Sequence, residues 1–89
     1  MIYITHIRLS PPNSRDHRHI TDLEWRNPAD GATGQNPRQS IVEWIEGRGE
    51  AFVQGSPDVR VHVVDAQPKF LRTAANNTYT DNLLNLPRF

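Results

Sequence analysis

The sequence predicts a small α+β domain in which one helix packs on a curved, mainly antiparallel sheet, with elements in the order ββαββββ. Apolar and polar residues alternate over several short stretches, as they do in half-buried strands. Only the stretch around residues 37–46 has apolar residues at helical spacing. The chain has 89 residues, the size of one domain, so residues 1–89 are expected to form a single domain.

The first two strands are expected over residues 2–9 and 19–25. Ile2, Ile4, Ile7 and Leu9 alternate with polar residues but shift phase by one residue near Thr5 and His6, which indicates a β-bulge. The prolines that follow cannot continue a strand, because successive prolines remove the donors of the ladder. The two strands therefore form a hairpin with a long polar connection.

Residues 27–36 contain a Pro, two Gly and several Asn and Asp residues, and this composition predicts a loop. A helix should follow, with Asn36 as its N-cap and Pro37 in its first turn. Its apolar stripe consists of Ile41, Val42, Trp44 and Ile45, so Trp44 is expected in the core. The Gly-Arg-Gly segment at residues 47–49 should end the helix.

Two further hairpins can be given a register. A four-residue loop at residues 55–58 would place Phe52 opposite Val61, on the core face of the sheet. Arg60 and His62 would then point away from the core. In the last hairpin, a two-residue turn at 76–77 would place Arg72 opposite Asp81 and Thr73 opposite Thr80. The leucines after this hairpin should cover the core, and they are Leu83, Leu84 and Leu86.

Composition disfavours some classes of function and excludes others. Ten basic residues balance ten acidic ones, so the chain lacks the basic excess typical of nucleic-acid-binding domains. The absence of cysteine excludes disulfides and thiolate chemistry and favours a cytoplasmic location. No signal peptide is expected at the N-terminus, and no apolar run approaches the ~18 residues of a membrane span. A chain this small has little room to enclose a cofactor, and none is expected.

The end of the chain resembles a known family. Residues 70–73 (Phe-Leu-Arg-Thr), a polar turn and residues 80–87 (Thr-Asp-Asn-Leu-Leu-Asn-Leu-Pro) are similar to the terminal signature of short bacterial proteins known as domain of unknown function 3892. The alternating strand at the N-terminus and the Val-Glu-Trp-Ile segment of the helix fit the same pattern. The resemblance implies one domain and a bacterial cytoplasmic protein. It implies no activity, cofactor or catalytic residue.

The densest polar cluster lies at residues 15–19, Arg-Asp-His-Arg-His. In an extended segment His17 and His19 would share one face, and a third ligand from His6 or Asp22 would complete a divalent-metal site. No zinc motif of fixed spacing is matched, and the sequence favours a solvated loop or a network that fixes the strand register. Ser14 and Asp16 beside His17 also suggest a hydrolytic triad, but neighbours in sequence rarely adopt that geometry.

A second group consists of arginines in or near the predicted strands: Arg8, Arg18, Arg26, Arg60 and Arg72. With Tyr3 or His62, they could form a sheet surface that binds single-stranded nucleic acid. The equal number of acidic residues instead favours a surface of ion pairs. Trp25 ends a strand, so either a place at the core edge or an exposed contact fits it.

The favoured hypothesis for function is a small non-catalytic interaction module. It would bind a protein partner, or a second copy of itself, through the sheet and its edge strands. The alternatives are a nucleic-acid-binding domain and a metal-binding protein or small metal-dependent enzyme.

Overall fold

The computed structural model describes residues 1–75 and 78–89 and confirms the α+β class, with one helix against a seven-stranded sheet. The elements are β1 (Ile2–Leu9), the 3₁₀ helix η1 (His17–His19), β2 (Ile20–Arg26), β3 (Thr33–Pro37), α1 (Arg38–Glu46), β4 (Ala51–Val53), β5 (Val59–Val64), β6 (Phe70–Ala75) and β7 (Thr78–Thr80). The strands lie in the order β3-β2-β1-β4-β5-β6-β7. Among the described strands, β1 and β4 are the only parallel neighbours, so the sheet is mainly antiparallel as predicted.

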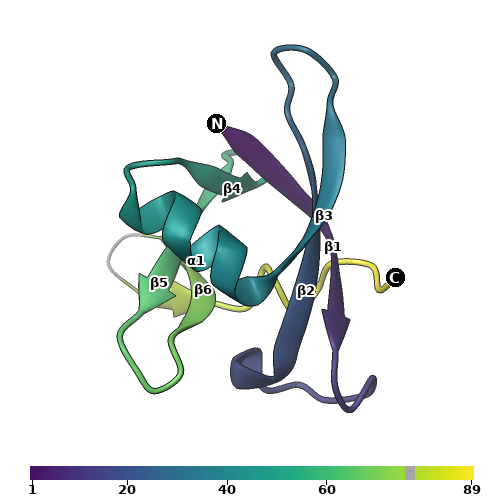
Figure 1. Cartoon of the computed structure of the whole chain (residues 1–89), viewed down its shortest axis with the longest axis vertical. Coiled ribbons are helices and arrows are strands. Elements are labelled where there is room, and N and C mark those ends of the chain that lie inside the picture. Colours follow the sequence, from purple (N-terminus) through teal and green to yellow (C-terminus); the bar gives the residue numbers. More distant parts are fainter. Residues whose placement is uncertain (76–77) are drawn as a thin grey trace.

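The sheet curves around α1, with β3, β2 and β1 on one side of the helix and β4, β5 and β6 on the other (Figure 1). The predicted bulge in β1 is present, since the pairing with β2 shifts between Ile4 and His6. The core lies between the helix and the concave face of the sheet. Its fully buried side chains include Ile4, Ile7, Leu23 and Val42.

Residues 33–37, expected as part of a loop and the helix start, form the edge strand β3 instead. β3 pairs with β2 over its whole length, from Arg26 opposite Thr33 to Asp22 opposite Pro37. The strand has no alternating apolar residues of its own, so the ladder to β2 defines it. The helix begins one residue later than expected, and no side chain caps its N-terminus.

The register predicted between β4 and β5 is wrong by one residue. Phe52 lies opposite Arg60 on the outer face, while Ala51 and Val53 are buried. The connecting loop is one residue longer than expected, because pairing of β4 ends at Val53. Within the loop, the Asp58 carboxylate accepts the N–H of Gly55. Val61 still faces the core, and Arg60 and His62 are exposed as predicted.

The C-terminal part of the chain behaves as predicted. Thr73 pairs with Thr80, and Arg72 Nη2 lies 3.0 Å from Asp81 Oδ1. Leu83 and Leu84 are buried, and Leu86 packs against the core from its edge. The turn predicted at residues 76–77 lies outside the described residues.

The chain after Leu84 runs back to β1. Ile7 N–H donates to the carbonyl of Pro87, and Phe89 N–H donates to the carbonyl of Ile7. This contact covers the edge of β1 beyond the short stretch that pairs with β4. The central strand of the sheet therefore has a partner on both sides along much of its length.

Candidate functional site

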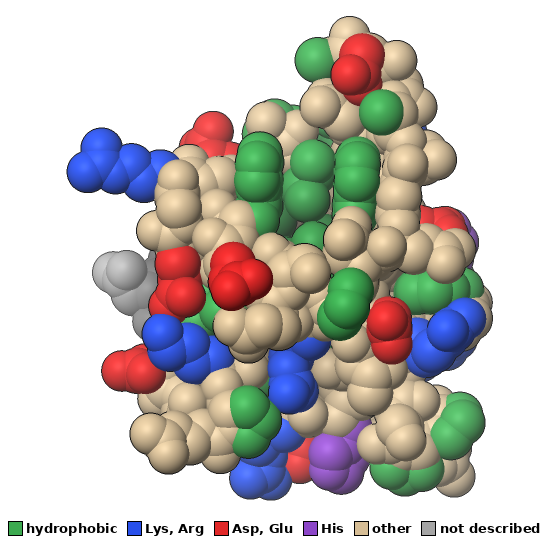
Figure 2. All heavy atoms as spheres, viewed as in Figure 1, with side chains coloured by type: hydrophobic (Ala, Val, Ile, Leu, Met, Phe, Trp, Pro, Cys, Tyr) green, Lys and Arg blue, Asp and Glu red, His purple; other side chains and the backbone are tan. Residues whose placement is uncertain are grey.

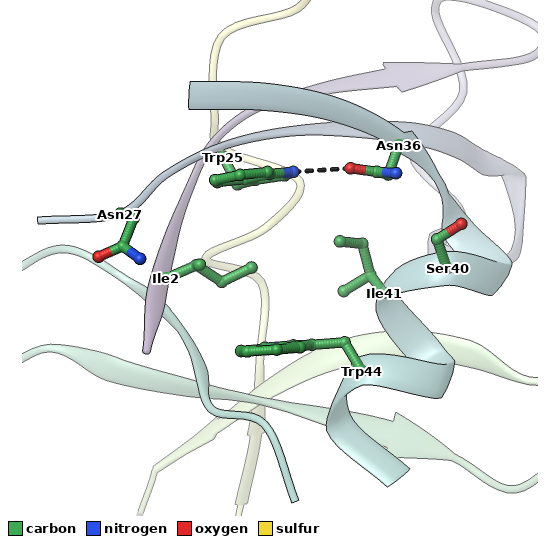
Figure 3. A pocket seen from close by; sticks show the side chains of 7 residues that line it. All are labelled: Ile2, Trp25, Asn27, Asn36, Ser40, Ile41 and Trp44. Atoms are coloured by element: carbon green, nitrogen blue, oxygen red, sulfur yellow. Dashed lines mark hydrogen bonds between the residues drawn. The ribbon is translucent and has the colours of Figure 1, made fainter. Parts of the chain in front are cut away.

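A cleft of about 280 Å³ lies between α1 and the strands β1, β2 and β3. In the space-filling view, apolar side chains gather in a hollow between α1 and β3 (Figure 2). The close-up shows the rings of Trp25 and Trp44 on opposite sides, with Ile2 and Ile41 between them (Figure 3). The lining residues are Ile2, Trp25, Asn27, Asn36, Ser40, Ile41 and Trp44.

The Trp25 ring is held in place from two directions. Its Nε1–H donates to Oδ1 of Asn36 over 2.8 Å. The ring also lies flat against Gly34, where an added Cβ would be only 2.5 Å from Cζ2 of Trp25. Asn36, predicted as the helix cap, thus fixes the tryptophan. The structure places Trp25 as a half-buried residue at the core edge and at the side of the cleft.

The Trp44 ring is positioned by the end of the helix. Arg48 adopts a positive φ of 75°, and its N–H donates to the carbonyl of Ile45. Gly49 N–H donates to the carbonyl of Trp44, so the chain turns back in a Schellman motif. This turn brings Gly49 against the indole, where a Cβ would lie 2.3 Å from Cε2. Trp44 was expected in the core, but 45% of it is exposed.

The cleft is apolar at its base and polar at its rim. Ile2 and Ile41 are 7% and 3% exposed. Asn27 and Ser40 contribute polar atoms, and Asn27 Oδ1 already accepts the N–H of Ala29. The seven lining residues carry no charge and no group that titrates near neutral pH. The site is therefore chemically suited to bind a neutral, apolar group.

The sequence did not predict this cleft. Trp44 belongs to the apolar stripe of the helix, and Trp25 and Trp44 are far apart in the chain. The sequence feature that could have indicated the cleft is a glycine that accompanies each tryptophan, in a nearby strand or turn. Gly34 faces Trp25 in the β2–β3 ladder, and Gly49 follows Trp44 after the helix end.

The arginines predicted as surface contacts are engaged within the molecule. Three of them pair with carboxylates: Arg18 with Asp16, Arg60 with Glu50 and Arg72 with Asp81. Arg8 instead donates to the carbonyl of Phe89, and Arg26 donates to the side chain of Gln54. A phosphate would have to compete with these contacts, so the geometry favours the interpretation of an ion-paired surface.

Aromatic rings do lie beside these guanidinium groups on the outer face. Arg26 is 5.4 Å from the ring centroid of Tyr3, and Arg60 is 5.7 Å from that of Phe52. Cation–π contacts of this kind stabilise the surface by about 0.5–1 kcal/mol each when exposed. Nucleic-acid binding by this face stays an alternative hypothesis.

The three predicted metal ligands do not converge. His17 and His19 belong to the short helix η1 rather than an extended segment. His19 Nδ1 lies 2.7 Å from Oγ of Ser14, and His6 Nδ1 lies 2.9 Å from Glu24. In residues 1–75 and 78–89, no three His, Cys, Asp or Glu side chains come close enough together to hold a metal. Metal binding by these residues stays a prediction.

In the suggested triad of Ser14, Asp16 and His17, Ser14 contacts His19 and not His17. Asp16 instead binds Arg18, which holds the pKa of the Asp16 carboxyl well below its usual value. Asp16 thus orients Arg18, not a histidine. A Ser–His pair alone is not a catalytic triad, which also needs a third orienting residue and an oxyanion hole.

His17 is buried, with only 7% of its surface exposed. Its Nε2 is 3.8 Å from Asp81 and has no hydrogen-bond partner in the described part of the chain. Burial lowers the pKa of the imidazole, and the positive charge of Arg72 lowers it further, against the opposing effect of Asp81 and Asp16. His17 is thus neutral in the folded protein at neutral pH.

We expect this histidine to make the protein less stable in mild acid. Below pH 6.5, the ordinary pKa of histidine, the unfolded chain binds a proton at His17 that the folded protein does not, so the free energy of unfolding decreases as the pH is lowered. One proton limits the slope to about 1.4 kcal/mol per pH unit. Urea denaturation between about pH 7.5 and pH 5 should show this component for the parent and not for His17→Gln. Equal pH dependence in the two proteins would contradict the assignment.

Comparison with other proteins gives one informative result. The model of the family described as "Protein of unknown function (DUF3892)" matches residues 3–87. Searches of curated proteins and of solved structures give no match. The described residues include no helix long and apolar enough to cross a membrane. Because the family model matches nearly the whole length, the chain belongs to the DUF3892 family of proteins of unknown function.

Proposed function

We propose that the protein is a non-catalytic binding module, and that it holds a protein partner in the cleft between Trp25 and Trp44. One observation carries this proposal: Trp44 is 45% exposed, and its indole faces that of Trp25 across an uncharged cleft. Solvent exposure of a large apolar ring is unfavourable for an isolated domain. A partner that covers the ring would recover this free energy.

Binding explains the cleft better than catalysis does. General acid–base catalysis requires a titratable group within hydrogen-bond reach of the substrate. The cleft is lined instead by two indoles, two isoleucines, two amides and a hydroxyl. These groups can pack against a ligand and orient it, but none exchanges a proton readily near neutral pH.

The dimensions favour part of a protein rather than a complete small molecule. The cleft volume of about 280 Å³ lies just below the ~300–1,000 Å³ typical of small-molecule sites. It would accommodate one or two apolar side chains. Tryptophan is among the residues that most often dominate protein–protein binding. The absence of cysteine favours a partner in the cytoplasm.

Trp44→Ala should strongly weaken partner binding and leave the fold intact. A library of random peptides displayed on phage, selected on the parent protein, would supply the probes. Loss of a buried Trp anchor costs about 2 kcal/mol or more, so the selected peptides should bind the variant roughly 30-fold more weakly. The free energy of unfolding should change by less than ~1 kcal/mol, because the indole is already half exposed.

Glu43→Ala is the matched control, since Glu43 is the exposed neighbour of Trp44 and does not line the cleft. Its affinity for the same peptides should equal that of the parent. If the selected peptides bind Trp44→Ala as tightly as the parent, the cleft is not the binding site.

A further inference from the structure

The cleft adjoins a free edge of the sheet. In the described part of the chain, β3 is the first strand in the sheet order and pairs with β2 alone. Asn27 N–H donates to the carbonyl of Ala32, so the adjacent pair of Arg26 with Thr33 is a non-hydrogen-bonded one. Hydrogen-bonded and non-hydrogen-bonded pairs alternate along an antiparallel ladder, so the backbone groups of Gly34 and Asn36 bond to β2. Thr33 and Gln35 therefore direct their N–H and C=O groups away from the sheet.

The position of Gly34 connects this edge to the cleft. Ile4, Trp25 and Gly34 are direct neighbours across β1, β2 and β3, on the face that carries the core. Because Gly34 has no side chain, the Trp25 ring extends over it toward the free edge. A residue on a strand added next to Gly34 would direct its side chain to the same face, against Trp25 and toward the cleft.

We propose that the occupant of the cleft is an extended peptide segment of the partner, which adds to β3 as a further strand and inserts one apolar side chain between Trp25 and Trp44. This inference rests on the proposed function. Thr33 and Gln35 provide the backbone hydrogen bonds, as in other cases of β-strand addition. The two indoles provide the specificity for the inserted side chain.

The lining of the cleft defines the chemistry of the peptide. No lining residue has a charge to compensate an ionised group, so the inserted residue is neutral and apolar. The side chains of Thr33 and Gln35 lie on the other face of β3 and are also neutral. The segment that fits is therefore extended, with an aliphatic or aromatic residue at its centre.

A second copy of this chain fits the cleft poorly. Its own β3 edge would bring Gly34 and Asn36 to the face that carries the cleft. Its other sheet edge, β7, carries Thr78 and Thr80 on the core face, while Tyr79 pairs with Ala74 on the outer face. On the core face, neither edge offers an apolar side chain to insert. The occupant is thus a different protein.

A pair of variants at Gln35 tests the edge directly. Gln35→Pro removes the outward N–H without affecting a bond to β2, and Pro37 already occupies an equivalent position in this strand. Gln35→Ala keeps the N–H, while both variants lose the side-chain bond to Glu24. The phage-selected peptides should bind Gln35→Pro roughly tenfold more weakly than Gln35→Ala.

Backbone N-methylation of a selected peptide, measured with the parent protein, gives a second test that does not depend on the folding of a variant. In strand addition only alternate amides bond to β3, so affinity should fall with a period of two residues. If methylation of the amides on either side of the inserted residue lowers the affinity, the added strand is antiparallel to β3. If methylation of the inserted residue's own amide lowers it, the added strand is parallel to β3. Either pattern supports the proposal.

The outcomes separate the two proposals. If Trp44→Ala loses binding but Gln35→Pro equals Gln35→Ala and no period of two appears, the cleft binds its partner and strand addition is wrong. If Trp44→Ala retains binding, the proposed function itself is wrong. If Trp44→Ala and Gln35→Pro both lose binding and the effect of N-methylation repeats every two residues, the proposed function and strand addition are both established.

Discussion

Deletion of residues 83–89 is expected to abolish cooperative unfolding or to lower the free energy of unfolding by more than ~4 kcal/mol. Leu83 and Leu84 are 0% and 4% exposed, and burial of each contributes roughly 1.5–3 kcal/mol. The deletion also removes the hydrogen bonds of Ile7 to Pro87 and Phe89. Small domains have only about 5–15 kcal/mol of stability in total.

Urea denaturation followed by circular dichroism would measure this effect. Leu83→Ala alone should cost about 2–5 kcal/mol, because it leaves a cavity in the core. Asn85→Ala, at an exposed position of the same segment, should cost less than ~0.5 kcal/mol. A truncated protein that unfolds in one transition with nearly the parent's stability would show that these leucines are not part of the core.

Gly34→Ala should both destabilise the protein and close the cleft to its partner. The new Cβ would lie 2.5 Å from the Trp25 ring, so the ring must move and lose its hydrogen bond to Asn36. Overpacking of this kind costs about 1–3 kcal/mol. The displaced ring would no longer face Trp44, so binding of the selected peptides should fall with stability.

Thr33→Ala is the control for this prediction, because it changes the adjacent exposed residue of the same strand. Trp25→Ala provides a further check. Once the ring is absent, Gly34→Ala should have almost no additional cost, so the two changes should be strongly non-additive. Additive losses would mean that Gly34 acts through its backbone conformation and not through its contact with Trp25.

Much of the sheet was predictable because apolar and polar residues alternate along its strands. The bulge in β1, the inward position of Val61 and the pair Arg72–Asp81 all followed from alternation and turn chemistry. The leucines of the C-terminal segment were predictable because no exposed position suits a cluster of them. In these segments local pattern and tertiary packing agree.

The cleft was not predictable, because its parts depend on tertiary contacts. Apart from Thr33, β3 consists of residues that do not favour strands, and it exists because β2 offers a ladder and Trp25 bonds to Asn36. Trp44 belongs to the helical apolar stripe but lines the cleft and is half exposed. Only the three-dimensional structure shows that Gly34 and Gly49 set the positions of the two rings.

The contact between the C-terminal segment and β1 also determines how the chain can fold. Arg8 and Phe89 touch although they are 81 residues apart in sequence. The β5–β6 hairpin closes a short loop and the β1–β2 hairpin a longer one, and both are local enough in sequence to form early. Joining them through β1 and β4, and then adding the C-terminal segment, requires ordering the long intervening chain first. Folding should therefore be slower than in helical proteins of this size, and the leucines of the last segment should act mainly on the rate of unfolding.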